Sequence, residues 1–120
     1  MPLKVDVTDR GASVFIVSPE GSIDANTYPV LEKEMEAVIA RAPAVVIVTM
    51  EKVDYISSAG VSVLIKAKRA LAEKKGEMVL VRLQPRVKKV FEIISALPPE
   101  QIFASEEELD RYLAEMQRKI

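Results

Sequence analysis

The sequence contains neither cysteine nor histidine. Without cysteine, the chain has no disulfide, no thiol nucleophile and no thiolate metal site. Without histidine, it lacks the side chain that most often serves as a general base or a metal ligand near neutral pH, and a Ser-His-Asp triad is impossible. We therefore expect a protein that is not an enzyme and that holds no metal.

The motifs that bind phosphates or carry a serine nucleophile are also missing. The chain has only four glycines, and they form neither Gly-x-Gly-x-x-Gly, nor Gly-x4-Gly-Lys-Ser/Thr, nor Gly-x-Ser-x-Gly. The consecutive acids Glu106, Glu107 and Glu108 lie in the first turn of a predicted helix, where they offset unpaired N–H groups. The sequence therefore predicts no cofactor and no acid-base site.

The chain has no excess of charge of either sign and no long hydrophobic run. It carries 17 basic and 18 acidic residues, for a net charge of −1. No overall field would attract nucleic acid or an acidic membrane surface, so neither partner is expected. No apolar stretch of roughly 18 residues occurs, and residues 1–8 alternate in polarity instead of forming a signal peptide. These features predict a cytoplasmic protein.

What the sequence does contain is enough apolar material for one core. Its length of 120 residues and hydrophobic content of 49% predict a single domain over residues 1–120, with no repeat or linker to divide it. Leu3, Val5 and Val7 alternate with polar residues, as in a half-exposed strand. A turn over residues 9–11 and a returning strand over 12–17, ending at residues 18–21, complete a predicted hairpin.

Two strongly apolar runs predict further strands, and the first of them is expected in the interior of the sheet. Residues 44–50 form an almost unbroken β-branched run, which is typical of a strand buried on both faces. Residues 78–83 form a further apolar strand, after a helix that Gly76 ends. The order strand, helix, strand implies a parallel pair joined by a crossover.

Four helices are expected, beginning near Thr27, Ser58, Pro85 and Ser105. Thr27 is a plausible N-cap, and Ser105 forms a capping box with Glu108. Residues 98–99, both proline, stop the third helix, and residues 101–103 form a possible last strand. The last helix has an apolar stripe that we assign to the core, with its outermost turn as an alternative partner contact: Leu109, Tyr112, Leu113, Met116 and Ile120. The predicted fold is α/β, with a mixed sheet of four or five strands and about four helices.

The stretch over residues 53–65 concentrates the unusual chemistry. It is predicted to be a strand end that turns directly into a helix, with Ser57 or Ser58 as the N-cap. The first turn of a helix has unpaired N–H donors and the positive end of the helix dipole, so this turn favours an anion. A phosphate on a serine would suit it.

These residues resemble a known family. Residues 54–61, Asp-Tyr-Ile-Ser-Ser-Ala-Gly-Val, are similar to the phosphorylation motif of bacterial anti-sigma factor antagonists, which are single STAS domains. Two further segments resemble that family in the same order, namely residues 21–24 and residues 76–81 followed by 85–91, so the likeness runs from about Lys4 to Leu113. Three motifs in register are more specific than any one of them.

The resemblance implies a phosphorylation site and a partner surface. Counting back from Gly60 in the family's motif gives Ser58 as the phosphorylated serine. The family has aspartate where this chain has Ser57, which makes Ser57 an alternative target. The implied partner-binding residues are Asp24, Asn26, Thr27, Ser57, Ser58, Ala59, Gly60 and Val61. For Asp24, an alternative is that it only fixes its own turn through a bond to the backbone.

The resemblance also implies a function. The unphosphorylated domain, as a monomer or weak dimer, would bind an anti-sigma factor that is also a serine kinase, and so release a sigma factor. Phosphorylation would then end the complex, with ATP held by the kinase. Two alternatives stay open: a STAS scaffold module of a signalling or transport complex that is never phosphorylated, and a STAS domain that binds a nucleotide or small ligand.

Overall fold

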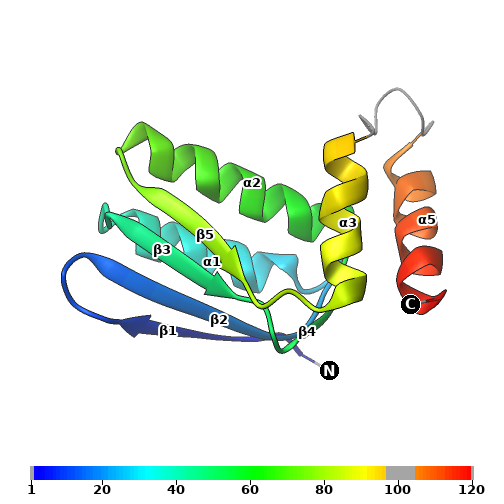
Figure 1. The fold of residues 1–120 in the computed structure, drawn as a ribbon, viewed down its shortest axis with the longest axis horizontal. Coiled ribbons are helices and arrows are strands. Elements are labelled where there is room, and N and C mark those ends of the chain that lie inside the picture. Colours follow the sequence, from blue (N-terminus) through cyan, green and yellow to red (C-terminus); the bar gives the residue numbers. More distant parts are fainter. Residues whose placement is uncertain (1, 97–104, 120) are drawn as a thin grey trace.

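A computed structural model describes residues 2–96 and 105–119. Over these ranges the chain forms five strands and four helices (Figure 1): β1 (Lys4–Asp9), β2 (Val14–Ile23), α1 (Tyr28–Ile39), β3 (Val45–Thr49), β4 (Val53–Ile56), α2 (Ser58–Glu73), β5 (Glu77–Val81), α3 (Pro85–Ala96) and α5 (Glu106–Lys119). All four predicted helix starts are confirmed within one residue. The possible strand over 101–103, the prolines at 98–99 and Ile120 lie outside the described residues.

The strands form one mixed sheet. Its order is β1-β2-β3-β5, and β4 also pairs with β2. β1 and β2 are antiparallel, whereas β2 with β3, β2 with β4, and β3 with β5 are parallel. The predicted hairpin and the predicted parallel pair around α2 are therefore confirmed. β3 lies between two strands, as its apolar sequence predicted.

β2 is longer than the sequence indicated. It runs through residues 18–21, where the strand was predicted to end. The N–H of Gly21 donates to the carbonyl of Lys52 at 2.9 Å, and strand alternation directs the nitrogen of Pro19 toward the same edge. β3 pairs with residues 14–17 and β4 with residues 21–23, so Pro19 lies in the gap between them. A proline is tolerated there because no ladder bond requires its missing N–H.

The predicted strand-to-helix junction over residues 53–65 is confirmed, but the strand that forms it is not the run predicted over residues 44–50. β3 ends at Thr49, residues 50–52 interrupt it, and β4 is a separate short strand before α2. β3 and β4 use the same edge of β2 in succession, with a register shift between Gly21 and Ser22. This shift is a bulge, which re-aims a strand locally. It gives β4 a different course from β3.

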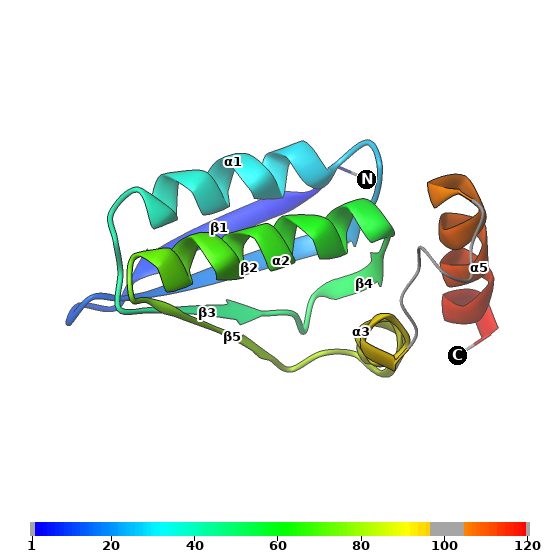
Figure 2. The same cartoon turned by 90° about the horizontal axis from the view of Figure 1, so that it is seen from above.

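The core lies between the sheet and the helices. α1 and α2 lie side by side over one face of the sheet, and α3 and α5 lie at one of its ends (Figures 1 and 2). Fully buried side chains come from all three parts: Val17, Leu31, Val46, Leu64, Leu71 and Leu113. Within residues 2–96 and 105–119, no helix is both long and apolar enough to cross a membrane.

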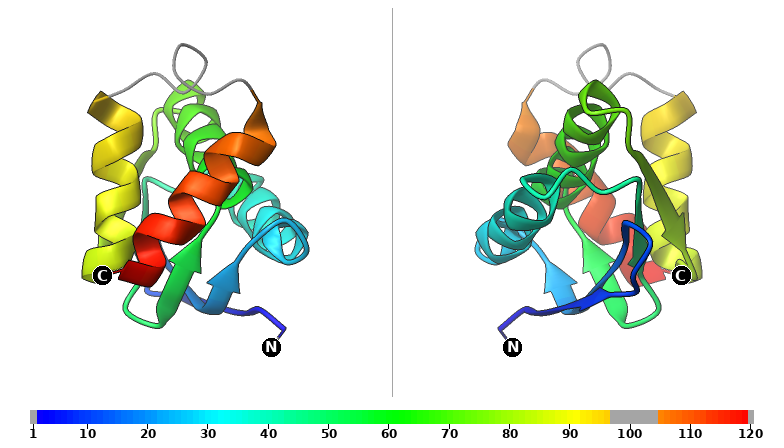
Figure 3. Two further views of the ribbon diagram at one scale, coloured as in Figure 1. Left: turned by 90° about the vertical axis from the view of Figure 1, so that its right-hand side faces the viewer. Right: turned by 90° about the vertical axis from the view of Figure 1, so that its left-hand side faces the viewer.

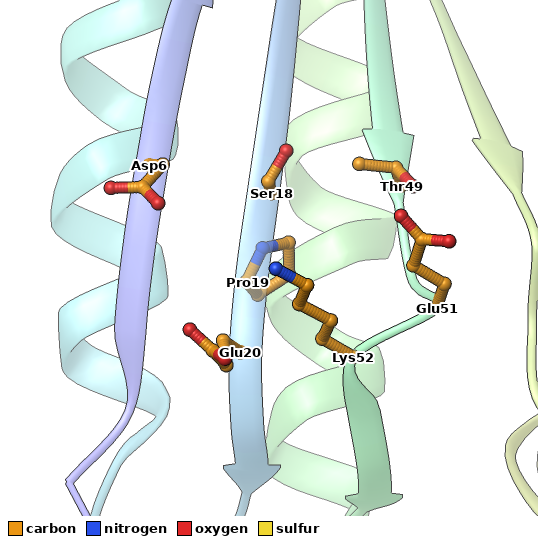
Figure 4. A pocket seen from close by; sticks show the side chains of 7 residues that line it. All are labelled: Asp6, Ser18, Pro19, Glu20, Thr49, Glu51 and Lys52. Atoms are coloured by element: carbon orange, nitrogen blue, oxygen red, sulfur yellow. The ribbon is translucent and has the colours of Figure 1, made fainter.

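The other face of the sheet carries a shallow hollow. Figure 4 shows it on the side opposite α1 and α2, lined by Asp6, Ser18, Pro19, Glu20, Thr49, Glu51 and Lys52. None of the residues predicted to bind a partner lines it. The candidate site therefore lies elsewhere, where β2 and β4 end.

Candidate functional site: the serine turn

Strand pairing brings the two predicted site segments together. β2 and β4 are parallel, and Ile23 pairs with Ile56 at their carboxyl ends. The next residues are Asp24 and Ser57, and the N–H of Ser57 donates to the carbonyl of Ile23 at 2.8 Å. The loop after β2 and the turn before α2 are therefore neighbours, as expected for strand ends at one edge of a parallel sheet.

Of the two cap candidates, Ser57 is the N-cap of α2. Its backbone is extended, and its hydroxyl accepts a hydrogen bond from the N–H of Gly60 at 3.4 Å. Ser57 is buried, with an exposed fraction of 3%. Ser58 is the first helical residue and is partly exposed, so the interpretation of Ser58 as the cap is wrong. The more exposed serine of the pair is therefore the one that does not cap the helix.

Gly60 holds the first turn of α2 close to the sheet. A Cβ on Gly60 would lie 2.6 Å from Cγ2 of Ile23 and 2.8 Å from Cγ1 of Ile56. Both distances are too short for any larger side chain without movement of the helix or of these two residues. The close approach fixes Ser58 relative to the ends of β2 and β4.

The loop after β2 is fixed by its own side chains. Oδ1 of Asp24 accepts hydrogen bonds from the N–H of Asn26 at 2.8 Å and of Thr27 at 3.0 Å. Asp24 therefore fixes its own turn, and it also lies next to the serines. The hydroxyl of Thr27 accepts from the N–H of Asp24 at 2.9 Å and donates to the carbonyl of Ser22 at 2.8 Å.

Thr27 occupies the N-cap position of α1 but makes no side-chain cap bond. The position was predicted correctly, and the predicted cap bond is wrong. The reason is that the Thr27 hydroxyl already binds the backbone of its own loop. The capping bond predicted for the last helix is present, because the N–H of Glu108 donates to the hydroxyl of Ser105 at 3.1 Å.

Two residues of α5 complete the site, and the sequence reasoning missed both. The N–H of Ser58 donates to Oδ1 of Asp110 at 2.9 Å. Gln117, with an exposed fraction of 1%, accepts from the N–H of Ile56 at 3.0 Å and donates to its carbonyl at 2.8 Å. The amide also donates to the carbonyl of Leu113 at 3.2 Å. Gln117 thus pairs with the free edge of β4 as a neighbouring strand would.

A sequence signal for Gln117 existed. It lies four residues after Leu113, on the apolar stripe of α5, where a polar side chain must find buried partners. Asp110 gave no such signal, because its partner is 52 residues away in the chain. The stripe itself behaves largely as predicted, since Leu109 and Leu113 are buried and Met116 is partly buried. Tyr112 is exposed.

The rim around Ser58 is acidic. Burial raises the pKa of the Tyr55 hydroxyl, and the nearby charges of Asp110 and Asp24 raise it further. Each of these effects disfavours a new negative charge at Tyr55. An anion added at this rim would be repelled by the carboxylates of Asp110 and Asp24 and attracted by the N–H donors at the start of α2.

The predicted partner-binding residues divide by exposure. Asn26 is exposed, and four others are partly exposed: Asp24, Thr27, Ser58 and Ala59. The remaining three are buried: Ser57, Gly60 and Val61. In the part of the chain that the structure describes, no group of three or more carboxylate, histidine or cysteine side chains could hold a metal ion.

Fold and site together define a small α/β domain that presents a serine on the first turn of a helix, beside the loop of a neighbouring strand. The chain belongs to the STAS domain family, whose family model matches residues 5–109. This confirms the resemblance given by the serine motif.

Several similar proteins are named as anti-sigma factor antagonists. The chain is 33% identical over 93 residues to the putative anti-sigma factor antagonist BtrV of Bordetella bronchiseptica, with 78% of each chain covered. It is 27% identical to the anti-sigma-B factor antagonist of Listeria monocytogenes, over 78% of this chain and 82% of that one. Among solved structures, an anti-sigma factor antagonist from Mycobacterium paratuberculosis superimposes with a TM-score of 0.63 at 26% identity, covering 80% of this chain and 83% of the other.

Proposed function

We propose that this protein is an anti-sigma factor antagonist controlled by phosphorylation of Ser58. The unphosphorylated form binds an anti-sigma factor that is also a serine kinase, and this binding releases a sigma factor for transcription. The observation that carries the proposal is the position of Ser58, partly exposed on the first turn of α2 beside the Asp24 loop. The names of the relatives support the same function.

Ser58 is a better phosphate acceptor than Ser57. A kinase must reach the hydroxyl, and Ser57 is buried with its hydroxyl bonded to the N–H of Gly60. Within residues 2–96 and 105–119, no group is hydrogen-bonded to the hydroxyl of Ser58. Phosphorylation of Ser58 therefore costs no cap bond, whereas phosphorylation of Ser57 would remove one.

The charges of the site explain how phosphorylation ends the complex. A phosphoserine carries about −1.5 to −2 charges and must lose its hydration in an interface. Asp24 and Asp110 already give the rim negative charge, so the phosphate adds repulsion to the cost of dehydration. In the free domain, the N-terminal end of α2 accommodates an anion. Phosphorylation can thus weaken partner binding without unfolding the domain.

Binding measurements on two variants test the proposal. Ser58→Ala removes the acceptor and adds no charge, so its affinity for the anti-sigma factor should equal that of the parent and persist in the presence of ATP. Ser58→Asp adds one charge at the rim and should weaken binding by at least about tenfold, less than phosphate because a carboxylate has less charge. Isothermal titration calorimetry with purified ATP-binding anti-sigma factors of the source organism measures both.

Ser62 provides the matched control. It is an exposed serine on the same helix, one turn after Ser58. Ser62→Asp adds the same charge farther from the rim and should change the affinity by less than about threefold. Equal weakening by the two aspartate variants would show a general charge effect and would reject Ser58 as the switch. Parent-like affinity of Ser58→Asp would favour the alternative of a STAS module that phosphorylation does not regulate.

The proposal assigns no chemistry to this chain. The kinase supplies ATP and transfers the phosphoryl group, and the chain supplies the acceptor hydroxyl. The chain has no histidine to act as a general base and none of the glycine motifs that bind phosphates. The site therefore works as a binding surface, in the compartment where sigma factors act.

A further inference from the structure

The carboxylate of Asp110 accepts a hydrogen bond from the first N–H group of α2. The unpaired N–H groups at the start of a helix attract anions, and here the anion is a carboxylate of the same chain. Oδ1 of Asp110 lies 2.9 Å from the nitrogen of Ser58. The place where a phosphate on Ser58 would find its nearest backbone donor is therefore already filled by a side chain of α5.

α5 is attached to the same end of the sheet at several points. Figure 3 shows α5 crossing the end of the sheet at which β2 and β4 finish. Asp110 binds the start of α2, and Gln117, near the other end of α5, binds the backbone of Ile56. Leu113 is buried between these two points, and Leu109 is buried next to Asp110. The position of the first half of α5 thus depends on the serine turn.

We propose that phosphorylation of Ser58 displaces Asp110 and loosens the first half of α5, so that α5 changes together with the modified serine. This inference rests on the proposed function. A serine hydroxyl is separated from its own amide nitrogen by only Cα and Cβ. A phosphate on Ser58 therefore comes against the carboxylate that binds that nitrogen, and two like charges compete for one donor.

The phosphate wins this competition. It carries more charge than a carboxylate and has three acceptor oxygens, so it is the better anion for the helix start. It is also attached to the residue whose N–H it binds, whereas Asp110 must be held there by the packing of α5. Since Leu109 is adjacent to Asp110, the first turns of α5 move when the carboxylate leaves.

The loosening is confined to part of the helix. Gln117 binds Ile56 on the far side of the turn, and its amide is neutral, so a phosphate on Ser58 does not repel it. The second half of α5 therefore stays on β4. In the phosphorylated form, a partner that contacts both the serine turn and the start of α5 encounters two changes: the phosphate on Ser58 and the loosened first half of α5.

The test uses protein in which phosphoserine is installed at position 58 during synthesis, and compares it with the unmodified chain by hydrogen-deuterium exchange. Amides of residues 109–114 should exchange at least about tenfold faster in the phosphorylated protein, whereas those of α1 should not change. Phosphoserine installed at position 62 is the control and should leave residues 109–114 unchanged. No kinase is needed, so a failure to find a kinase for Ser58 would reject the proposed function without affecting this result.

Asp110→Asn separates charge from packing. Asparagine keeps the size and one acceptor oxygen but removes the negative charge, so the effect of phosphoserine at position 58 should shrink from about tenfold to less than about threefold. The inference is overturned if the two forms of the parent exchange at the same rate over residues 109–114. It is equally overturned if Asp110→Asn keeps the full increase, or if phosphoserine at position 62 produces it.

Discussion

Removing the amide of Gln117 should destabilise the domain far more than its place near the end of α5 suggests. In Gln117→Leu, the side chain keeps a similar size but loses three hydrogen bonds, two of them to Ile56. The N–H and carbonyl of Ile56 then remain buried without these partners. A buried polar group without a partner costs about 1–3 kcal/mol, so the expected loss in the free energy of unfolding for these two groups is about 2–6 kcal/mol.

Urea unfolding followed by circular dichroism measures this loss. Gln84→Leu is the matched control, because Gln84 donates a similar bond to the carbonyl of Glu51 at 2.8 Å but is partly exposed. Water can replace that bond, so the control should lose less than about 1 kcal/mol. If Gln117→Leu were as stable as the Gln84 variant, the argument that Gln117 completes the edge of β4 would be refuted.

Gln117→Glu adds a pH dependence with a definite sign. One glutamate oxygen can accept from the N–H of Ile56, but the other faces the carbonyls of Ile56 and Leu113 and can donate only when it is protonated. Burial and these carbonyls should raise the pKa of the new carboxyl group above its unfolded value of about 4.3. The variant should therefore be closest to the parent below about pH 4, and it should lose stability as the pH rises through the raised pKa.

The remaining predictions concern the serine turn itself. Gly60→Ala should lose about 1–3 kcal/mol in urea unfolding, because its Cβ would meet two isoleucine side chains at under 3.0 Å. Ser57→Ala should lose about 1 kcal/mol with its cap bond, whereas Ser58→Ala should lose less than about 0.5 kcal/mol. In an NMR titration of its ring carbons, Tyr55 should ionise above pH 10.0, and Asp110→Asn should lower its pKa without restoring 10.0, because burial is the larger cause.

The elements predictable from the sequence are those with local signals. Prolines, caps and apolar periodicity placed the helix starts, and the β-branched run placed β3 inside the sheet. β4 was not predicted as a separate strand, because it has only four residues and includes the polar Asp54. Its sequence pattern could not be distinguished from that of the turn that follows it. Its existence depends on pairing with β2, a contact that the local sequence does not encode.

In the candidate site as well, some features could be predicted from the sequence and others could not. The serine motif and the loop with Asp24 were visible, because each follows a strand, and parallel strands end at one edge. The contacts of Asp110 and Gln117 were not visible, because they join side chains of α5 to backbone groups 52 and 61 residues away. A buried glutamine on an apolar stripe is the one feature that could have indicated such a contact.

Whether Ser58 is the switch can be measured by incubating the purified protein with ATP and its anti-sigma kinase, locating the modification by mass spectrometry, and titrating both forms against the kinase. We expect one phosphate on Ser58 and an affinity for the kinase at least about a hundredfold lower in the modified form, with the fold unchanged by circular dichroism. An unmodified Ser58, or equal affinities of the two forms, would contradict this expectation.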